Sequence, residues 1–293
     1  MQEQLRILAG KMLADGRAAR VLGWKRTDFE TAPEPSFFTA QDDLSELVYN
    51  KYCAANLSGF MIGAGKRDGV TVVFLKPCDT YSFNQLVKEH QIDRAKAYVV
   101  GVSCGGNAKV EEMEDVGWLE RCLVCTKHDH VVYDELVLDE SLSRPEAQDR
   151  FGGVTRLEGL QSLERYEFWQ GELSTCIRCN ACRNVCPACN CKKCVFDSAK
   201  YDTAAKANVT TFEEQLFHII RAYHVAGRCT DCGECARVCP QDIKLQLLNR
   251  KIIKDINELY GEFQAGQDTE TLGPLTAFNA DTDAEPSIVH TRG

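Results

Sequence analysis

The sequence predicts an α/β region with a short parallel sheet, followed by a helical, cysteine-rich region. Two runs of β-branched and aromatic residues, at 70–75 and 97–102, flank a segment with helical spacing of apolar residues, which is the pattern of a βαβ unit with parallel strands. Later, one cysteine pattern occurs twice, each time after apolar residues with helical periodicity, at 157–173 and 212–226. We therefore expect domains over 1–150 and 151–262, and a polar tail over 263–293 that is either disordered or a docking arm.

The composition is that of a folded protein with an unusual number of cysteines. Apolar residues make up 44% of the 293 residues, and 16 residues are cysteine. The net charge of -9, without long clusters of Lys and Arg, argues against nucleic acid as a partner. Apolar runs are far shorter than the roughly 20 residues that a membrane-spanning helix needs, so we expect no direct membrane span. The first residues lack the basic and apolar pattern of a secretory leader, and we expect a cytoplasmic protein.

The first part of the chain contains three further predicted elements. Apolar residues at helical spacing predict a helix within residues 5–20. A short strand is expected at 36–39, and the acidic stretch 42–47 predicts the start of another helix. The glycine-rich stretch 63–69 precedes a strand, whereas a phosphate-binding loop joins a strand to a helix, so we expect a turn there.

Two cysteines directly follow the predicted parallel strands. Cys78 comes after the first strand and Cys104 after the second. Because the carboxyl ends of neighbouring parallel strands lie at one edge of the sheet, we expect these two thiols to be close. Cys122-x-x-Cys125 follows a short helical stretch and completes a four-thiolate set. The sequence therefore predicts a 4Fe-4S cluster held by Cys78, Cys104, Cys122 and Cys125.

The histidines near these and later cysteines are expected to have no ligand role. His128 and His130 follow Cys125, and a solvated loop is a more ordinary interpretation than hydrogen bonds that tune a cluster. His218 and His224 are not spaced as neighbours on one helix face, so we expect packing or surface positions.

The repeated cysteine pattern has the spacing of bacterial ferredoxins. It reads Cys-x-x-Cys-x-x-Cys-x-x-x-Cys-Pro and begins at Cys176 and again at Cys229. In this spacing three cysteines bind one 4Fe-4S cluster and the fourth binds the other cluster. Disulfides and zinc are the alternatives, but zinc sites usually combine paired Cys-x-x-Cys units without the final proline. We expect one cluster on Cys176, Cys179, Cys182 and Cys239, and another on Cys229, Cys232, Cys235 and Cys186.

The remaining cysteines predict a fourth cluster. Cys189-x-Cys191-x-x-Cys194 lies in a turn-prone stretch, where 192–193 is a lysine pair that would offset negative charge. Cys53 is the candidate for the fourth ligand. The alternative is that Cys53 packs as a buried apolar residue and that the triplet binds zinc or nothing.

Residues 10–140 resemble the beta subunits of deazaflavin-reducing hydrogenases and formate dehydrogenases. The resemblance rests on the order of four motifs: Lys51-Tyr52, Pro77-Cys78-Asp79, Gly101-Val102-Ser103-Cys104 and Cys122-x-x-Cys125. That family uses such cysteines for a 4Fe-4S cluster beside a flavin, so the resemblance leaves FAD open as a further cofactor. Residues 151–262, with a helix before each motif and a long gap between motifs, look like the all-helical dicluster ferredoxin domain of succinate dehydrogenase and heterodisulfide reductase subunits.

These features predict an electron-transfer subunit of a cytoplasmic, anaerobic oxidoreductase complex of the hydrogenase, formate dehydrogenase or heterodisulfide reductase type. It would relay single electrons, and no nucleophile–base pair or nucleotide fingerprint points to catalytic residues. The expected partners are other subunits of the complex, including a flavoprotein or heterodisulfide-reductase-like subunits. The main alternative is a flavoenzyme subunit that exchanges a hydride with a deazaflavin or NAD(P) and passes single electrons to its clusters. A zinc-stabilised scaffold is a third, more distant interpretation.

Overall fold

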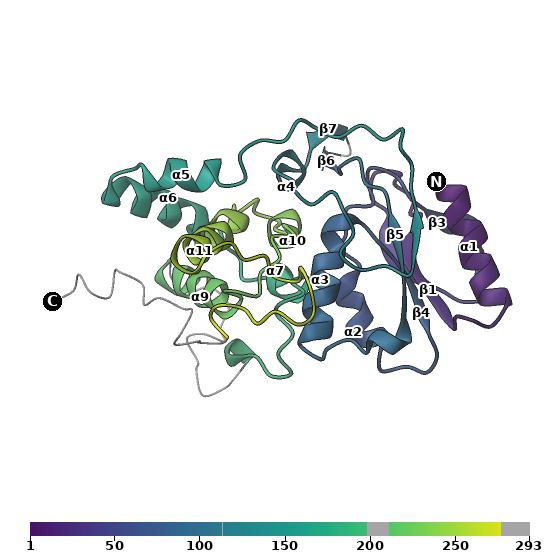
Figure 1. The fold of residues 1–293 in the computed structure, drawn as a ribbon. Helices are drawn as coiled ribbons and strands as arrows, with labels where there is room; N and C mark the ends of the chain where they lie inside the picture. Colours follow the sequence, from purple (N-terminus) through teal and green to yellow (C-terminus); the bar gives the residue numbers. More distant parts are fainter. Residues whose placement is uncertain (113, 198–210, 277–293) are drawn as a thin grey trace. The chain divides into compact units, whose positions relative to one another are not determined.

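A computed structural model describes residues 1–112, 114–197 and 211–276 of the chain (Figure 1). The chain divides into two compact units. The first unit comprises Met1–Arg150 together with Gly266–Thr269, and the second comprises Phe151–Ala265 together with the segment that begins at Glu270. Of the tail expected over 263–293, residues 277–293 lie outside the described residues.

The first unit is built on a six-stranded sheet with the strand order β2-β1-β4-β5-β8, in which β3 also pairs with β1. Strands β1, β4, β5 and β8 are parallel to one another, and β2 and β3 run antiparallel to β1. The strands are β1 (Arg20–Lys25), β2 (Glu34–Phe38), β3 (Leu47–Val48), β4 (Thr71–Leu75), β5 (Ala97–Val102) and β8 (Glu135–Val137). A separate two-stranded sheet consists of β6 (Ala108–Glu111) and β7 (Glu114–Trp118).

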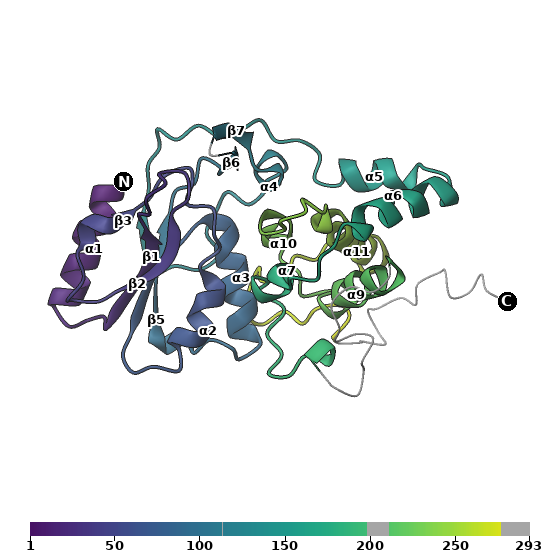
Figure 2. The same ribbon diagram turned by 180° about the vertical axis from the view of Figure 1, so that it is seen from behind.

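Helices cover both faces of this sheet (Figures 1 and 2). Helix α1 (Gln2–Ala14) lies on one face, and α2 (Met61–Ala64) and α3 (Pro77–Lys88) lie on the other. All five residues of β4 are buried, as expected for a parallel strand between two helical layers. The predicted β4-α3-β5 unit is confirmed, with Leu75 paired to Gly101 where the two strands end. Shorter elements are the 3-10 turns η1 (Leu44–Glu46), η2 (Ser58–Phe60) and η3 (Arg94–Lys96), and the single-turn helix α4 (Glu120–Leu123).

Two predictions for the first unit were wrong in extent. The first helix ends at Ala14, because Gly16 adopts the left-handed φ of 65° and turns the chain into β1, a strand that the sequence analysis did not predict. The acidic stretch 42–47 forms only the turn η1. The chain then pairs with β1 through Leu47 and Val48, and this pairing replaces further helical turns.

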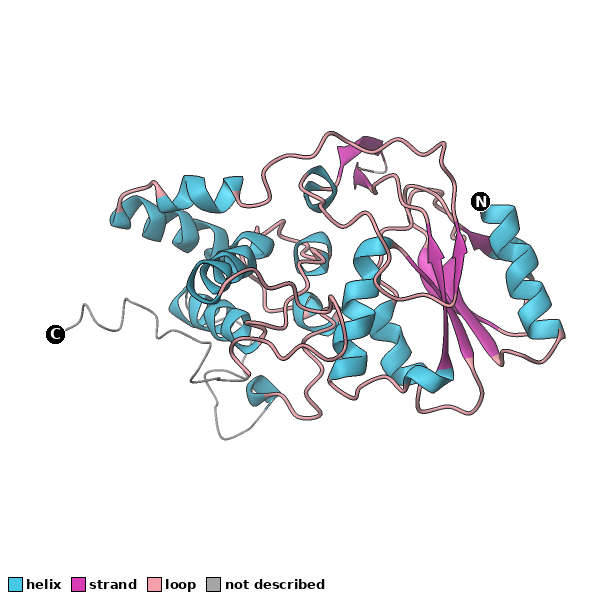
Figure 3. Ribbon diagram, viewed as in Figure 1, coloured by secondary structure: helices cyan, strands magenta, loops and turns pink. Residues whose placement is uncertain are grey.

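The regular elements described in the second unit are all helices (Figure 3). They are α5 (Gly152–Glu158), α6 (Ser162–Ser174), α7 (Ala181–Asn184), the 3-10 turn η4 (Val195–Asp197), α9 (Thr211–His224), α10 (Glu234–Arg237) and α11 (Leu245–Tyr260). A helix precedes each cysteine motif as expected, but the stretch 157–173 is interrupted after Glu158, and α6 begins only at Ser162. Helix α9 packs against α6 and α11. Among all the described residues, no helix is both long enough and apolar enough to cross a membrane.

Candidate metal centres

The two cysteine motifs of the second unit adopt the same backbone conformation. Two residues after the first cysteine of each motif, Arg178 and Asp231 have left-handed φ values of 52° and 55°. Asn180 (φ 61°) and Gly233 (φ 68°) repeat this conformation two residues later and begin the short helices α7 and α10. Residues other than glycine adopt positive φ rarely, so its recurrence at matching positions indicates one backbone path around the thiols.

This backbone path points N–H groups at sulfur. The Arg178 N–H donates to the Cys176 Sγ at 3.4 Å, and the N–H of Asp231 donates to the thiol of Cys229 at the matching position. The third cysteine of each motif then lies on the short helix, Cys182 on α7 and Cys235 on α10. Backbone donors to cysteine sulfur are the contacts that stabilise an anionic iron-sulfur group.

The structure brings together the first predicted quartet. One cavity of the second unit is lined by four cysteines and by the apolar residues Phe217, Ile243 and Leu245. The four are three cysteines of the first motif and the last cysteine of the second: Cys176, Cys179, Cys182 and Cys239. This is the exchange of fourth ligands that the motif spacing predicts, while cluster binding itself stays a prediction.

The second quartet is grouped around Cys186. Burial, and then the neighbouring thiol of Cys186, raise the pKa of Cys232 well above its ordinary value. Burial, Asp231 and Cys186 together raise the pKa of Cys229 to about 12. The last cysteine of the first motif therefore lies with Cys229, Cys232 and Cys235 of the second. Such thiols stay protonated at neutral pH without a metal, and ligation by iron would displace their protons.

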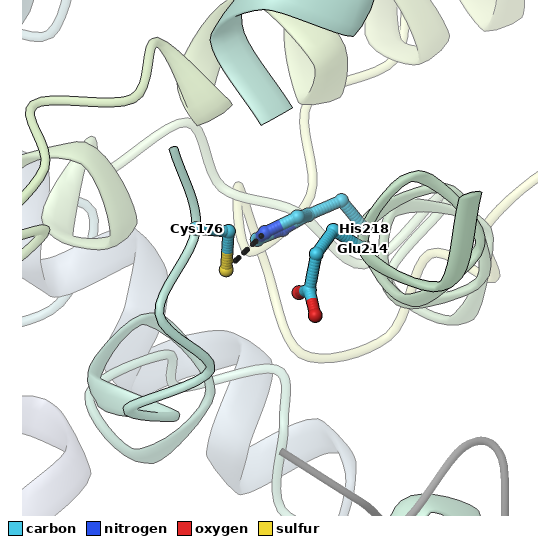
Figure 4. A group of neighbouring side chains, drawn as sticks. All are labelled: Cys176, Glu214 and His218. Carbon is cyan, nitrogen blue, oxygen red and sulfur yellow. Dashed lines mark hydrogen bonds between the residues drawn. The ribbon is translucent and has the colours of Figure 1, made fainter. Parts of the chain in front are cut away.

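Helix α9 directs polar side chains at these thiols from its buried face. Glu214 and His218 are 0% and 1% exposed, and their ligand atoms lie within 4.8 Å of the Cys176 sulfur (Figure 4). The His218 Nε2 is 3.2 Å from the Cys176 Sγ. Burial lowers the pKa of His218 to about 3, so the ring is neutral and can donate one N–H to sulfur. His218 was expected at a packing or surface position, and no sequence pattern singled out Glu214.

A third buried residue on the same face is Arg221. Its side chain is 2% exposed, and in the described part of the chain its three nitrogens have no carboxylate partner and face cysteine thiols such as that of Cys235. Burying a cation without a partner costs several kcal/mol, at roughly the scale measured for broken buried ion pairs. Thiolate-bound 4Fe-4S clusters are anionic, so an uncompensated guanidinium among cysteines fits such clusters better than it fits neutral thiols.

The spacing of the thiols disfavours single zinc ions. The ligands of one zinc ion lie about 2.3 Å from the metal and hence close to one another. Among the described residues, no three thiols lie within 4.8 Å of each other, because Cys176, Glu214 and His218 form the one close group. The described thiols therefore do not form a preformed site for a single zinc ion.

In the first unit, Cys78 and Cys104 lie at the edge where β4 and β5 end. Cys78 is in the first turn of α3, and burial, with the charge of Asp79, raises the pKa of its thiol well above the ordinary value. The Cys104 Sγ accepts from the Gly106 N–H at 3.4 Å, and the Cys122 Sγ accepts from the Asn107 N–H at 3.2 Å. Burial raises the pKa of Cys104, and the thiol of Cys122 adds to this rise.

The fourth thiol of this set, that of Cys125, belongs to the same turn as Cys122, because the Cys125 N–H donates to the Cys122 carbonyl oxygen at 3.4 Å. Burial, then the charges of Asp129, Cys125 and Cys78, raise the pKa of Tyr81, so both cysteines act on this ring from its surroundings. The structure thus groups Cys78, Cys104, Cys122 and Cys125 in the first unit, and their binding of a cluster stays a prediction.

Buried cations border this set as well. The Lys76 Nζ is fully buried, lies 2.8 Å from the Asp79 Oδ2 and donates to the Cys53 carbonyl oxygen at 3.1 Å. Burial opposes the charge of Lys76, yet Asp79 and Cys78 raise its pKa above the ordinary value. Arg121 is also buried and donates to the Ala54 carbonyl oxygen. The charge of Lys76 is therefore balanced by a carboxylate of the protein itself.

His130 is not the solvated loop residue that was expected. Its Nε2 is 3.2 Å from the carbonyl oxygens of both Leu75 and Val102, so it joins the ends of β4 and β5. Gly101 makes this contact possible, because a Cβ there would lie 2.8 Å from the His130 ring. Burial lowers the pKa of His130, which favours the neutral ring.

Cys53 has a different environment from the other cysteines of the first unit. It is 0% exposed and belongs to the apolar core. Its Sγ accepts from the Asn50 N–H at 3.4 Å and donates to the Val48 carbonyl oxygen at 3.7 Å, and burial raises its pKa to about 11. This burial favours the alternative that Cys53 is a packing residue.

The other members of the predicted fourth set lie in the second unit. A hydrogen bond from Cys186 lowers the pKa of Cys189, Cys191 is exposed and Cys194 is half-buried. The fourth cluster on Cys53, Cys189, Cys191 and Cys194 stays a prediction.

A cavity of about 210 Å³ opens at the same sheet edge of the first unit. Its polar lining includes Ser103, His128, Tyr133 and Arg144. The Arg144 Nε donates to the Cys104 carbonyl oxygen at 2.9 Å, and its Nη1 lies 2.6 Å from the His128 Nδ1. The cavity thus adjoins the cysteine set through Cys104, and no sequence motif indicated its presence.

Comparison with known proteins supports the sequence interpretation. The family described as a 4Fe-4S dicluster domain matches residues 172–243. The chain is 22% identical to the F420-dependent formate dehydrogenase subunit beta of Methanocaldococcus jannaschii, over 87% of this chain and 88% of that protein. It is also 22% identical to the F420-dependent formate dehydrogenase 1 subunit beta of Methanococcus maripaludis, over 58% and 67% of the respective chains. The predicted resemblance to such beta subunits, joined to a dicluster domain, is confirmed.

Proposed function

We propose that the chain is the iron-sulfur electron-transfer subunit of an oxidoreductase complex of the formate dehydrogenase type, in which it passes single electrons between redox partners. The observation that carries this proposal is the cavity that Cys239 shares with Cys176, Cys179 and Cys182. Cysteines from distant parts of the sequence meet there in the pattern of a two-cluster ferredoxin. The beta-subunit relatives support the type of complex.

The second unit would serve as an α-helical dicluster ferredoxin. A 4Fe-4S cluster, when bound, accepts and releases one electron at a time. The protein's own part is to ligate, to exclude water and to balance charge. Phe217, Ile243 and Leu245 line the first cavity and keep it apolar, while the N–H groups of Arg178 and Asp231 and the ring of His218 donate to sulfur. The two proposed ligand sets are Cys176, Cys179, Cys182 and Cys239, and Cys186, Cys229, Cys232 and Cys235.

The first unit would hold a third cluster on Cys78, Cys104, Cys122 and Cys125. Arg121 supplies buried positive charge beside these thiols and opposes the rise in the pKa of Cys78, whereas the charge of Lys76 is shared with Asp79. The partners would be other subunits of a cytoplasmic, anaerobic complex, among them a flavoprotein or heterodisulfide-reductase-like subunits. A hydrogenase-type complex is the alternative to the formate dehydrogenase type.

The cavity beside Cys104 supports a second candidate function, that of a flavoenzyme subunit. Arg144, His128 and Tyr133 offer polar and aromatic groups at the carboxyl edge of a parallel sheet, where α/β folds bind ligands. Bound FAD would exchange a hydride with a deazaflavin or NAD(P), and the cysteine clusters would take single electrons.

Anaerobic purification of the full chain tests both candidates. We expect a brown protein with about twelve irons per chain, four for each of three clusters, and an EPR signal after reduction. FAD released at about one per chain would select the flavoenzyme. A colourless protein without iron would overturn both and favour the zinc scaffold.

A further inference from the structure

Arg221 lies where the two cysteine motifs of the second unit meet. Cys182 and Cys235 are the third cysteines of their motifs, and the helices that carry them, α7 and α10, pack against each other. Phe217, one turn before Arg221 on α9, belongs to the same apolar cluster as both of these cysteines. The buried face of α9 therefore reaches the junction of the motifs.

The guanidinium of Arg221 faces thiols of both quartets. Burial opposes its charge, but Cys235, Cys182 and Cys186 hold its pKa above the ordinary value. In turn Arg221 opposes the rise that burial causes in the pKa of Cys182 and of Cys235. Cys182 belongs to the first quartet, whereas Cys186 and Cys235 belong to the second, so one cation is shared by the two sets.

Other buried arginines of the second unit differ from Arg221 in their charge balance. The Arg250 Nε is 2.9 Å from an Asp231 oxygen, and the Arg178 Nη1 is 3.8 Å from a Glu214 oxygen. Within the described residues, Arg221 has no carboxylate partner, and its nearest polar groups are cysteine thiols, among them those of Cys235 and Cys189. Its charge therefore faces the groups that these cysteines would bind.

We propose that Arg221 is a shared counter-charge for the two clusters of the second unit and raises the reduction potential of both. The proposal rests on the two clusters proposed above. Reduction adds an electron to a cluster that is already anionic, so a nearby uncompensated cation stabilises the reduced form more than the oxidised form. A single residue placed between two clusters shifts their potentials in the same direction.

Arg221→Met removes the charge and keeps much of the apolar volume. At a fixed potential, we expect the ratio of reduced to oxidised cluster to fall roughly tenfold for both clusters, which corresponds to about 59 mV for a one-electron couple. Arg221→Lys keeps the charge and should restore most of the ratio. The measurement is an anaerobic redox titration of the full chain followed by EPR, with iron content determined for each variant.

Arg250→Met is the matched control, because Arg250 is equally buried but already paired with Asp231. Its loss leaves Asp231 uncompensated beside Cys229. The control should therefore lower the potential of the cluster held by Cys229 and leave that of the cluster held by Cys176 near its wild-type value.

Each outcome decides the proposal. Unchanged potentials in Arg221→Met, or a shift in only one cluster, would overturn it while leaving the proposed function intact. If Arg221→Met assembles no clusters whereas Arg221→Lys assembles both, the need for positive charge is supported. If both variants fail to assemble them, Arg221 has a packing role and the proposal is wrong. A wild-type chain without iron would instead overturn the proposed function.

Discussion

The two units differ in how they balance buried positive charge next to cysteines. In the first unit, Lys76 is paired with Asp79 at 2.8 Å, and both side chains are almost completely buried. In the second unit, Arg221 is as deeply buried but has no hydrogen-bonding carboxylate among the described residues. The buried charge of Lys76 is therefore neutralised by the protein itself, whereas the buried charge of Arg221 calls for negative charge on a group that the neighbouring thiols would bind.

The apolar cores of the two units also differ in whether they contain proposed metal ligands. In the first unit one apolar cluster extends from Leu5 on α1 to Val102 on β5 and covers both faces of the sheet. The main cluster of the second unit is smaller, and cysteines stand within it beside Leu173 and Phe217. A core whose members are metal ligands is complete only with the metal in place. We therefore expect the first unit to fold without a cluster and the second unit to require its clusters in order to fold.

The largest expected effect is on the fold of the iron-free protein. When iron is removed anaerobically with a chelator, the second unit should unfold while the first stays folded. The reason is that the apolar core of the first unit contains none of the four cysteines proposed to bind its cluster, whereas that of the second contains proposed ligands. Hydrogen exchange with mass spectrometry should show lost amide protection in α9 and α11 and retained protection in β4 and β5. An equal loss of amide protection in both units, or full protection in α9, would contradict the expected difference between the units.

A smaller effect is expected from single cysteines of the first unit. Cys104→Ser should lower the iron content by about four per chain without changing the EPR signals of the second unit. Cys53→Ser is the matched control. Its burial in the apolar core makes an unchanged iron content the expected result. Loss of about four irons in the control would instead establish Cys53 as a ligand of a fourth cluster.

The ion pair of the first unit can be tested by its effect on stability. Asp79→Asn leaves the fully buried Lys76 without its carboxylate and should lower the free energy of unfolding by about 3–5 kcal/mol. Glu111→Gln, which breaks an exposed pair with Lys109, should cost less than about 1 kcal/mol. Urea unfolding of both variants gives the comparison. Equal urea midpoints for the two variants would show that the buried ion pair contributes no more to the free energy of unfolding than an exposed pair.

The smallest expected effect is a pH dependence from His130. Burial depresses its pKa in the folded state below the ordinary 6.5, so the unfolded chain binds the proton more tightly. The contribution of His130 to stability is thus complete above pH 6.5 and is lost as the pH falls below that value. We expect a small loss of the free energy of unfolding at mildly acidic pH, measured by urea unfolding. His130→Gln should remove this slope, and a variant that keeps it would contradict the assignment.

Much of the first unit follows from local sequence pattern. The strands β4 and β5 were predictable because their residues are continuously apolar, and parallel pairing then places Cys78 and Cys104 at one edge. Strand β1 was missed because Gly23 interrupts its apolar run. A Cβ at Gly23 would lie 3.2 Å from the Phe74 ring, so a neighbouring strand explains the glycine. That neighbour lies far along the sequence, and no local pattern shows it.

The candidate sites likewise contain residues that the sequence pattern predicted and residues that it did not. The cysteine quartets were predictable because ferredoxin spacing specifies which thiol joins which set. Glu214, His218 and Arg221 were not, because polar residues at this spacing on an amphipathic helix ordinarily face solvent. Their burial depends on where α9 packs, and that position is set by contacts with α6 and α11. The spacing of cysteines in the sequence therefore predicts the ligands, whereas the residues around the ligands can be identified only from the folded structure.

The exchange of fourth ligands between the two motifs is tested most directly by Cys239→Ser in the full chain. EPR of the reduced, anaerobic protein should show loss or alteration of the cluster held by Cys176, Cys179 and Cys182, while the cluster held by Cys229, Cys232 and Cys235 is retained. Cys186→Ser should give the reverse pattern. If Cys239→Ser instead removes the cluster at Cys229 and spares the one at Cys176, each motif closes on itself and the arrangement proposed for the second unit is wrong.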